Sequence, residues 1–74
     1  MGRDYDQIRK QLGLNIKALR RQKKLSQEEL AHSTGLDRTY ISQVERGVGN
    51  PSLLVLCKLA AIFEIDVIEL MSDN

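Results

Sequence analysis

Apolar residues recur along most of this chain at intervals of three and four, and no stretch alternates apolar with polar residues over the length of a β-strand. This spacing predicts an all-α protein. The clearest repeat predicts a helix over residues 6–23, with an apolar stripe formed by Ile8, Leu12, Ile16 and Leu19. Gly13 weakens this helix by about 1 kcal/mol relative to alanine, but its small size suits close packing against a neighbour.

A second, shorter helix is expected over residues 27–34. Ser26 followed three residues later by Glu29 forms a capping box, in which each side chain bonds to the backbone amide of the other. Gly35 supplies the left-handed conformation that ends helices at low cost. The helix has a small apolar face, made of Leu30 and Ala31.

A third helix is expected over residues 38–46, where Asp37 can serve as the cap and Gly47 as the end. Its inward apolar residues are Tyr40, Ile41 and Val44. The segment 47–52 that follows holds two glycines, Asn50 and the only proline, all of which favour a turn or loop. The two short helices on either side of Gly35 are therefore expected to be followed by a loop.

The last part of the chain is expected to form two helices, over residues 52–63 and 67–71. The first has an inward apolar face made of Leu53, Leu56, Leu59, Ala60 and Phe63. The second starts at Asp66, which with Glu69 resembles another capping box. The pattern therefore predicts a single domain, over residues 1–74, of five helices.

Charge changes this picture, because the net charge of +1 hides an uneven distribution. Residues 1–49 carry a net charge of +4, and residues 50–74 carry −3. The basic part is the part suited to a polyanion. No apolar run approaches the 18 or so residues of a membrane span and no charged-then-apolar leader is present, so we expect a cytoplasmic protein.

Nothing in the sequence indicates an enzyme. No glycine-rich phosphate loop, paired His and Cys motif or nucleophile elbow is present. His32 is expected on the outer side of a short helix, and Cys57, the only cysteine, within an apolar helix where burial of free cysteine is common. We expect no metal, cofactor or small-molecule ligand.

Two short helices joined by a tight turn containing glycine are the elements of a helix-turn-helix. They are the segments LSQEELAHSTG and LDRTYISQVERG. Together with the following NPS, these segments resemble the Xre and lambdoid phage repressor/Cro family of DNA-binding proteins, which has a lambda-repressor-like fold. The DRTYIS stretch is similar to the controller proteins of restriction-modification systems. The resemblance covers about residues 8–71.

The resemblance implies roles for the matching positions. Arg38, Thr39 and Gln43 are implied as readers of base edges in the major groove, a role that suits arginine because its fork can bond guanine O6 and N7 together. Gln27 is implied as a contact to a backbone phosphate, where the amides at a helix N-terminus also favour an anion.

Several neighbours of these residues have two interpretations. The Tyr40 ring either packs inward or brings its hydroxyl to the DNA, and Arg46 either contacts phosphate or is solvated. Asn50 matches a phosphate-contacting position but is also a turn former, and Ser42 shares the polar face. The basic run of Arg21, Lys23 and Lys24 suits either a phosphate contact or a solvated helix end.

The resemblance also implies that Arg20 and Glu45 form an ion pair that ties the first helix to the end of the third. Such a pair would hold the recognition helix in position without touching a base. If the pair is largely buried, removal of one partner should cost about 3 to 5 kcal/mol.

A dimer is expected on two grounds. A chain of this size buries only about three-fifths of its unfolded surface, and one cysteine cannot supply disulfides. The last two helices also carry more apolar residues than one core needs, and contiguous exposed apolar surface usually marks an interface. The surplus residues are Leu54, Val55, Ala61, Ile62 and Ile68. A homodimer would place two recognition helices about 34 Å apart on a pseudo-palindromic operator.

The regulatory setting stays open at this point. The main hypothesis is a controller protein that binds double-stranded DNA, and the alternative is an antitoxin-type or phage-type repressor whose fold also binds a protein partner. Activation would require contact with RNA polymerase, for which Glu28 and Glu29 are candidates by resemblance, although they can equally be capping residues.

Overall fold

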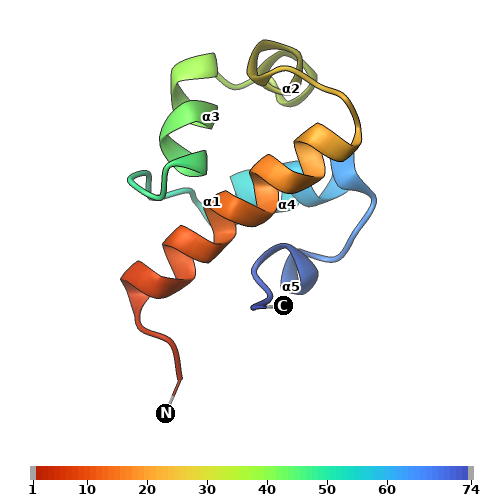
Figure 1. The fold of residues 1–74 in the computed structure, drawn as a ribbon. Helices are drawn as coiled ribbons and strands as arrows, with labels where there is room; N and C mark the ends of the chain where they lie inside the picture. Colours follow the sequence, from red (N-terminus) through yellow and green to blue (C-terminus); the bar gives the residue numbers. More distant parts are fainter. Residues whose placement is uncertain (1, 74) are drawn as a thin grey trace.

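The computed structural model describes residues 2–73, and five helices account for the regular structure of this part of the chain. Figure 1 shows them in order. They are α1 (Tyr5–Gln22), α2 (Gln27–Thr34), α3 (Arg38–Glu45), α4 (Leu53–Phe63) and α5 (Val67–Leu70). The predicted all-α class and the number of helices are confirmed within these residues. The bounds predicted for 27–34 agree, and each of the other predicted bounds is wrong by at most one residue at either end.

The helix α1 begins at Tyr5, one residue before the predicted start, because its cap lies at Asp4. Asp4 is the N-cap, and it forms a capping box in which its carboxylate accepts from the Gln7 amide at 2.9 Å and its own amide donates to Gln7 Oε1 at 2.8 Å. The helix ends at Gln22, one residue earlier than expected, because Lys24 takes a left-handed conformation with φ 58°. Lysine lacks the conformational freedom of glycine, so the pattern offered no signal for this end.

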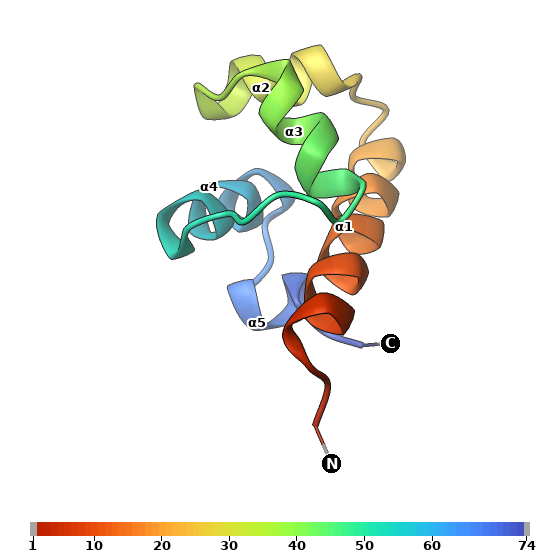
Figure 2. The same ribbon diagram turned by 90° about the vertical axis from the view of Figure 1, so that its left-hand side faces the viewer.

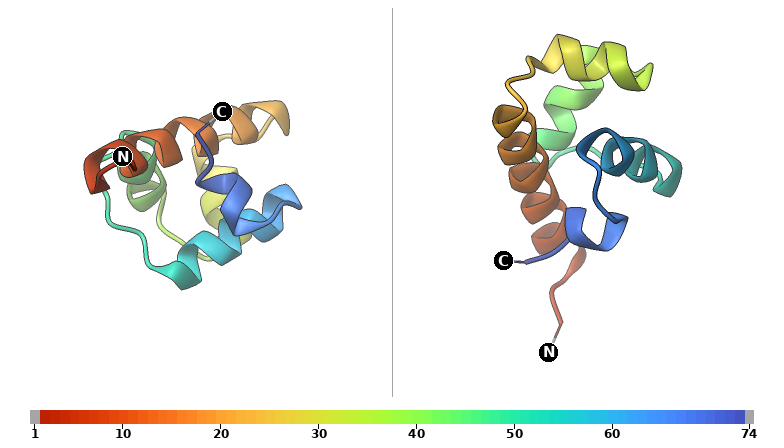
Figure 3. Two further views of the ribbon diagram at one scale, coloured as in Figure 1. Left: turned by 90° about the horizontal axis from the view of Figure 1, so that it is seen from below. Right: turned by 90° about the vertical axis from the view of Figure 1, so that its right-hand side faces the viewer.

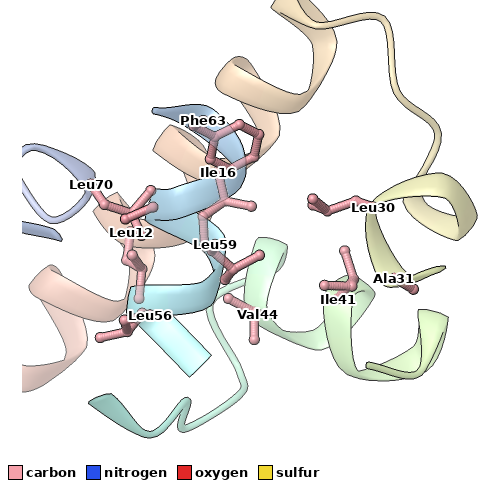
Figure 4. Close-up of a cluster of buried hydrophobic side chains, with 11 residues drawn as sticks. Leu12, Ile16, Leu30, Ala31, Ile41, Val44, Leu56, Leu59, Phe63 and Leu70 are labelled. Carbon is pink, nitrogen blue, oxygen red and sulfur yellow. The ribbon is translucent and has the colours of Figure 1, made fainter. Parts of the chain in front are cut away.

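One hydrophobic core joins all five helices. Figure 4 shows buried side chains from α1, α2, α3, α4 and α5 converging on a common centre, where Ile16, Leu30 and Leu59 are fully buried. Figure 2 shows α2 and α3 at one end of the molecule and α4 and α5 at the other, with α1 running alongside both groups. The core is formed by Leu12, Ile16, Leu30, Ala31, Ile41, Val44, Leu56, Leu59, Ala60, Phe63 and Leu70.

The start of α4 corrects two expectations. The helix begins at Leu53 and not at residue 52, because Ser52 is its N-cap and accepts from the Val55 amide at 3.2 Å. Leu53 was expected to face inward, but its side chain is 68% exposed. The first turn of α4 extends beyond the core, and Leu56 is the first residue of the helix that is buried.

The short helix α5 starts differently from the prediction and ends at Leu70, one residue before the predicted 71. The Asp66 carboxylate accepts from the Ile68 amide at 2.8 Å, so the cap is closed two residues on and Glu69 forms no reciprocal bond. The segment after α5 returns to α1, where Asn15 donates to the Leu70 and Ser72 carbonyl oxygens at 2.9 and 2.8 Å. Figure 3 shows this final segment lying across α1. No helix among residues 2–73 is long and apolar enough to span a membrane.

Candidate nucleic-acid interface

The turn between α2 and α3 is built from the residues that the sequence indicated. Ser26 Oγ accepts from the Glu29 amide at 3.0 Å, and the Ser26 amide donates to Glu29 Oε1 at 2.8 Å. The Ser26 backbone amide, with a smaller contribution from the Ser26 hydroxyl, holds the pKa of the Glu29 carboxyl below its usual value. At the other end of α2, Gly35 has φ 71°, and the next amide, of Leu36, donates to the Ala31 carbonyl at 2.9 Å. The chain therefore turns within three residues into α3.

The helix α3 has two faces of different character. Ile41 and Val44 are buried in the core, on the side where α3 packs against α1 and α2. The opposite face is polar and carries the side chains that the resemblance implies as base readers, all of them exposed: Arg38, Thr39 and Gln43. Arg46, just past the helix, is exposed as well, and Ser42 is half-buried. Figure 2 shows α3 running across this side of the molecule, with the loop that follows it on the same side.

Tyr40 is half-buried and packs against the edge of the core. This contact agrees with the inward interpretation of its ring. The helix also differs from the other four at its start, because Asp37 is the N-cap by position but its carboxylate makes no capping hydrogen bond. The expected side-chain cap on α3 is therefore wrong.

A network of hydrogen bonds fixes α3 against α1 and α2. Arg20 donates from Nε to Glu45 Oε2 at 2.6 Å and from Nη2 to Glu45 Oε1 at 3.0 Å, so the pair is bidentate. The guanidinium also donates to the Leu25 carbonyl at 2.8 Å. Both side chains are nearly enclosed, with 11% of Arg20 and 3% of Glu45 exposed. The bond with Glu45 raises the pKa of Arg20, which keeps the guanidinium charged.

The sequence did not indicate that Gln27 belongs to this network. Its Nε2 donates to Glu45 Oε1 at 3.1 Å, so the residue implied as a phosphate contact is anchored to the recognition helix in the free protein. A glutamine at the first position of a helix gives no signal for a bond to a residue 18 positions away. Only the packing of α2 against α3 brings them together.

Gly13 permits the close approach of α1 and α3. A Cβ atom built at Gly13 would lie 2.5 Å from the carbonyl oxygens of Val44 and Glu45, which are backbone atoms and cannot rotate away. Glycine is therefore required at the point where the two helices meet. The sequence predicted a close contact at Gly13, and the structure identifies the end of α3 as the neighbour.

The loop after α3 holds a fixed shape. Gly47 has φ 76°, and its amide donates to the Val44 carbonyl at 3.1 Å while the Val48 amide donates to the Gln43 carbonyl at 3.1 Å. This pair of bonds is the Schellman arrangement, which satisfies the last carbonyl groups of a helix. Asn50, which follows this turn, is exposed.

The helices α4 and α5 carry exposed apolar side chains, here called the α4–α5 face. Leu54 is 66% exposed and Ile68 is 76% exposed. Ala61 is exposed too, whereas Val55 and Ile62 are half-buried against the core. Leu53 and Cys57, both expected to be buried, are exposed and lie next to these residues along α4. The α4–α5 face is therefore larger than the sequence indicated.

The described residues contain no cluster of three or more His, Cys, Asp or Glu side chains suited to a metal ion. His32 is exposed on the outer side of α2, as expected. The chemistry of the polar side of α3 is that of hydrogen-bond donors and cations presented on a rigid helix, an arrangement that fits the edges of bases and the phosphates beside them.

Comparisons with known proteins agree with this geometry. A family model described as helix-turn-helix matches residues 16–70. Control protein C.MunI of Mycoplasma sp is 45% identical over 67 residues, which cover 89% of this chain and 90% of that protein.

Two solved structures are similar as well. The restriction-modification controller protein C.AhdI from Aeromonas hydrophila is 46% identical with a TM-score of 0.78, over 82% of this chain and 92% of that one. The N-terminal DNA binding domain of SinR from Bacillus subtilis is 34% identical with a TM-score of 0.79, over 85% of this chain and 93% of that one. The chain therefore belongs to the helix-turn-helix family.

Proposed function

We propose that this protein is a transcriptional regulator of the restriction-modification controller type, which binds a pseudo-palindromic DNA operator as a homodimer. The observation that carries the proposal is the construction of α3. Its inner face is locked to the core and to Arg20 through Glu45, while Arg38, Thr39 and Gln43 extend into solvent from the other face. The similarity to C.AhdI and C.MunI, which are named as controller and control proteins, supports the regulatory setting.

Sequence reading is assigned to the exposed residues at the start of α3. Arg38 bonds guanine, and Thr39 and Gln43 contact neighbouring base edges in the major groove. Contacts to the sugar-phosphate backbone are assigned to Ser42 and Arg46 on and just after α3 and to Asn50 in the loop that follows. Such contacts position the helix but carry little sequence information.

Gln27 has a role between these two groups. Its bond to Glu45 at 3.1 Å holds the amide at the N-terminus of α2, where a phosphate would meet it together with the free backbone amides. A phosphate bound at Gln27 would therefore be connected to α3 through the hydrogen bond between Gln27 and Glu45. Tyr40 supports α3 from the core side.

The homodimer is assigned to the α4–α5 face, with Leu54, Ala61 and Ile68 at its centre and Val55 and Ile62 behind them. A small monomer rarely exposes a contiguous apolar surface of this kind without a partner. Cys57 lies on the same exposed stripe of α4 and provides a natural probe, because oxidation would link two protomers only if the two stripes meet.

Contact with RNA polymerase, if the protein activates transcription, is assigned to Glu28 and not to Glu29. The Glu29 carboxylate is engaged by the Ser26 amide at 2.8 Å, whereas Glu28 is exposed one residue earlier. A Glu28→Gln variant that binds the operator normally and still loses activation would support this assignment. Normal activation by that variant would exclude it.

The proposal is tested by selecting bound sequences from random DNA with the wild type and with Arg38→Ala. The wild type should select two half-sites related by two-fold symmetry. Arg38→Ala should lose preference at one position per half-site, by about 1 to 3 kcal/mol, while retaining its affinity for unrelated DNA. Equal losses on every sequence would make Arg38 a backbone contact, and no enriched sequence with the wild type would overturn the proposal.

The dimer is tested separately by sedimentation at micromolar concentration. The wild type should sediment as a dimer, and Leu54→Glu should sediment as a folded monomer because the side chain is already exposed in one protomer. Leu14→Glu, the same substitution at a leucine of α1 that is 59% exposed and lies outside the α4–α5 face, serves as the matched control and should remain a dimer. A monomeric wild type would exclude the α4–α5 face as the dimer interface.

A further inference from the structure

We propose that the edge of α1 beside α3, formed by Lys10 and Lys17, contacts DNA phosphates outside the bases that α3 reads. This pair of lysines is called the phosphate-binding line. The inference rests on the proposed function, and it assigns a role to two residues outside the helix-turn-helix. It predicts an operator footprint that extends beyond the bases read by α3.

The first observation is a long segment of the chain whose charged residues are all basic. Residues 7–27 contain seven Lys and Arg residues and no Asp or Glu. Three of the seven are occupied, because Arg9 pairs with Asp6 at 2.9 Å, Arg20 with Glu45 at 2.6 Å, and Lys23 approaches Glu64 at 3.7 Å. Among the described residues, the four without an ion pair are Lys10, Lys17, Arg21 and Lys24.

The second observation is the direction in which two of these residues lie. Gly13 marks the side of α1 that touches α3, because an added Cβ would meet the backbone of Val44 and Glu45 at 2.5 Å. Lys10 and Lys17 are one turn before and one turn after Gly13 on that side. Lys10 adjoins the end of α3 directly, since its Cα and Cγ would lie 3.2 Å from a Cβ atom at Gly47.

The two lysines are therefore separated by two helical turns, about 10 Å along α1, and they border the recognition helix on the side of Arg46. Lys10 is exposed and Lys17 is half-buried, and neither side chain makes an ion pair with a residue of the described part of the chain. Together with Arg46 they form a row of cations next to the polar face of α3. A row of like charges complements a row of phosphates.

Figure 2 shows α1 and α4 on opposite sides of α3. If two protomers meet through the α4–α5 face, the edge of α1 is directed toward the ends of the operator. The lysines would then contact phosphates flanking each half-site. Such contacts add affinity for any sequence and leave the preference among sequences unchanged.

The test compares Lys10→Gln/Lys17→Gln with the control Lys23→Gln/Lys58→Gln. Both double variants remove two charges per protomer, and glutamine keeps the Cβ and Cγ of Lys10 that adjoin Gly47. The control removes one lysine that faces Glu64 and one on α4, away from the edge of α1. Sedimentation first establishes that both variants form the same dimer as the wild type.

The salt dependence of operator binding is then measured. Four phosphate contacts per dimer are lost in the first variant, so the slope of log K against log salt should become shallower by about 3 to 4. Operator and unrelated DNA should weaken by equal factors. Lengthening the duplex beyond each half-site should strengthen binding by the wild type and the control variant but not by Lys10→Gln/Lys17→Gln.

A slope equal to that of the control variant, or an equal benefit from longer flanks in all three proteins, would overturn the phosphate-binding line and leave the proposed function intact. A wild type with no preference for any operator would overturn the proposed function, and this inference with it.

Discussion

The helices α3 and α4 are built alike on the inside and differently on the outside. Each presents one apolar stripe to the same core, through Ile41 and Val44 in α3 and through Leu56 and Leu59 in α4. The outer face of α3 is polar and partly cationic, whereas the outer face of α4 carries Leu54 and other apolar residues at high exposure. The difference supports the two partners proposed above, a polyanion for α3 and a second copy of the chain for α4.

The two helices are also held in different ways. The inner side of α3 includes a charged residue, Glu45, that is bonded to side chains on α1 and α2. The helix α4 is held by apolar packing and by its Ser52 cap, and its last turn ends in a left-handed residue that is not glycine. A helix that reads DNA must keep a fixed orientation, and directional bonds fix an orientation better than apolar contact does.

The largest expected effect is on the anchor of α3. Glu45→Ala leaves the Arg20 guanidinium enclosed without its partner, so the free energy of unfolding should fall by about 3 to 5 kcal/mol. Thermal unfolding measures the loss, and operator affinity should fall with it. Arg20→Met/Glu45→Leu, which removes both charges and keeps apolar volume, should recover much of the stability. An unchanged melting temperature for Glu45→Ala would mean that the pair contributes nothing to the stability of the fold.

The next effect concerns the contact between α1 and α3. Gly13→Ala should lower the stability by about 1 to 3 kcal/mol, although alanine favours helices, because its methyl group would meet backbone oxygens at 2.5 Å. Chemical denaturation compares this variant with Gly2→Ala, where an added Cβ meets nothing within 4 Å. Stabilisation by Gly13→Ala would show that the two helices can separate freely, contrary to a rigidly seated recognition helix.

The ends of the two helices allow a direct comparison. Gly47 after α3 and Glu64 after α4 share the left-handed conformation, with φ 76° and 58°. Glu64→Gly should therefore raise the stability by about 1 kcal/mol, and Gly47→Ala should lower it by at least as much. The ion pair of Glu64 with Lys23 is too exposed to offset the gain. Melting temperatures at equal protein concentration measure both changes. A lower melting temperature for Glu64→Gly would contradict the prediction that the left-handed conformation of Glu64 is costly.

The smallest effects separate the starts of the two helices. Ser52 caps α4 through the Val55 amide, so Ser52→Ala should cost about 1 kcal/mol of stability. Asp37 makes no capping bond to α3, and Asp37→Ala should change the stability of the free protein much less. Equal losses in the two variants, measured by denaturant unfolding, would show that Asp37 caps α3 in solution.

Much of this fold could be predicted from residues that act locally. Capping pairs such as Ser26 with Glu29, and glycines such as Gly35 and Gly47, fix helix ends through contacts within four or five residues. Errors arose where the local signal was absent or ambiguous. Lys24 ends α1 without being glycine, and Asp66 closes its cap on Ile68 and not on Glu69.

The candidate site divides in the same way. Its polar face could be predicted because Arg38, Thr39 and Gln43 lie on one side of a helix whose other side is apolar. Leu53 and Cys57 could not be placed correctly, because helical periodicity assigns an inward face but does not say where the core ends along α4. The bond between Gln27 and Glu45 had no local signal at all.

The sequence by itself determined the five helices, the turn between α2 and α3 and the face of α3 that is free to meet DNA, because spacing and capping are properties of neighbouring residues. Only the tertiary structure decided what lies against what. It placed Gly13 against the end of α3, joined Gln27 to the Arg20–Glu45 pair and brought Lys10 beside Gly47. Such contacts depend on the approach of helices that are distant along the chain, and their geometry is settled only when the common core is packed.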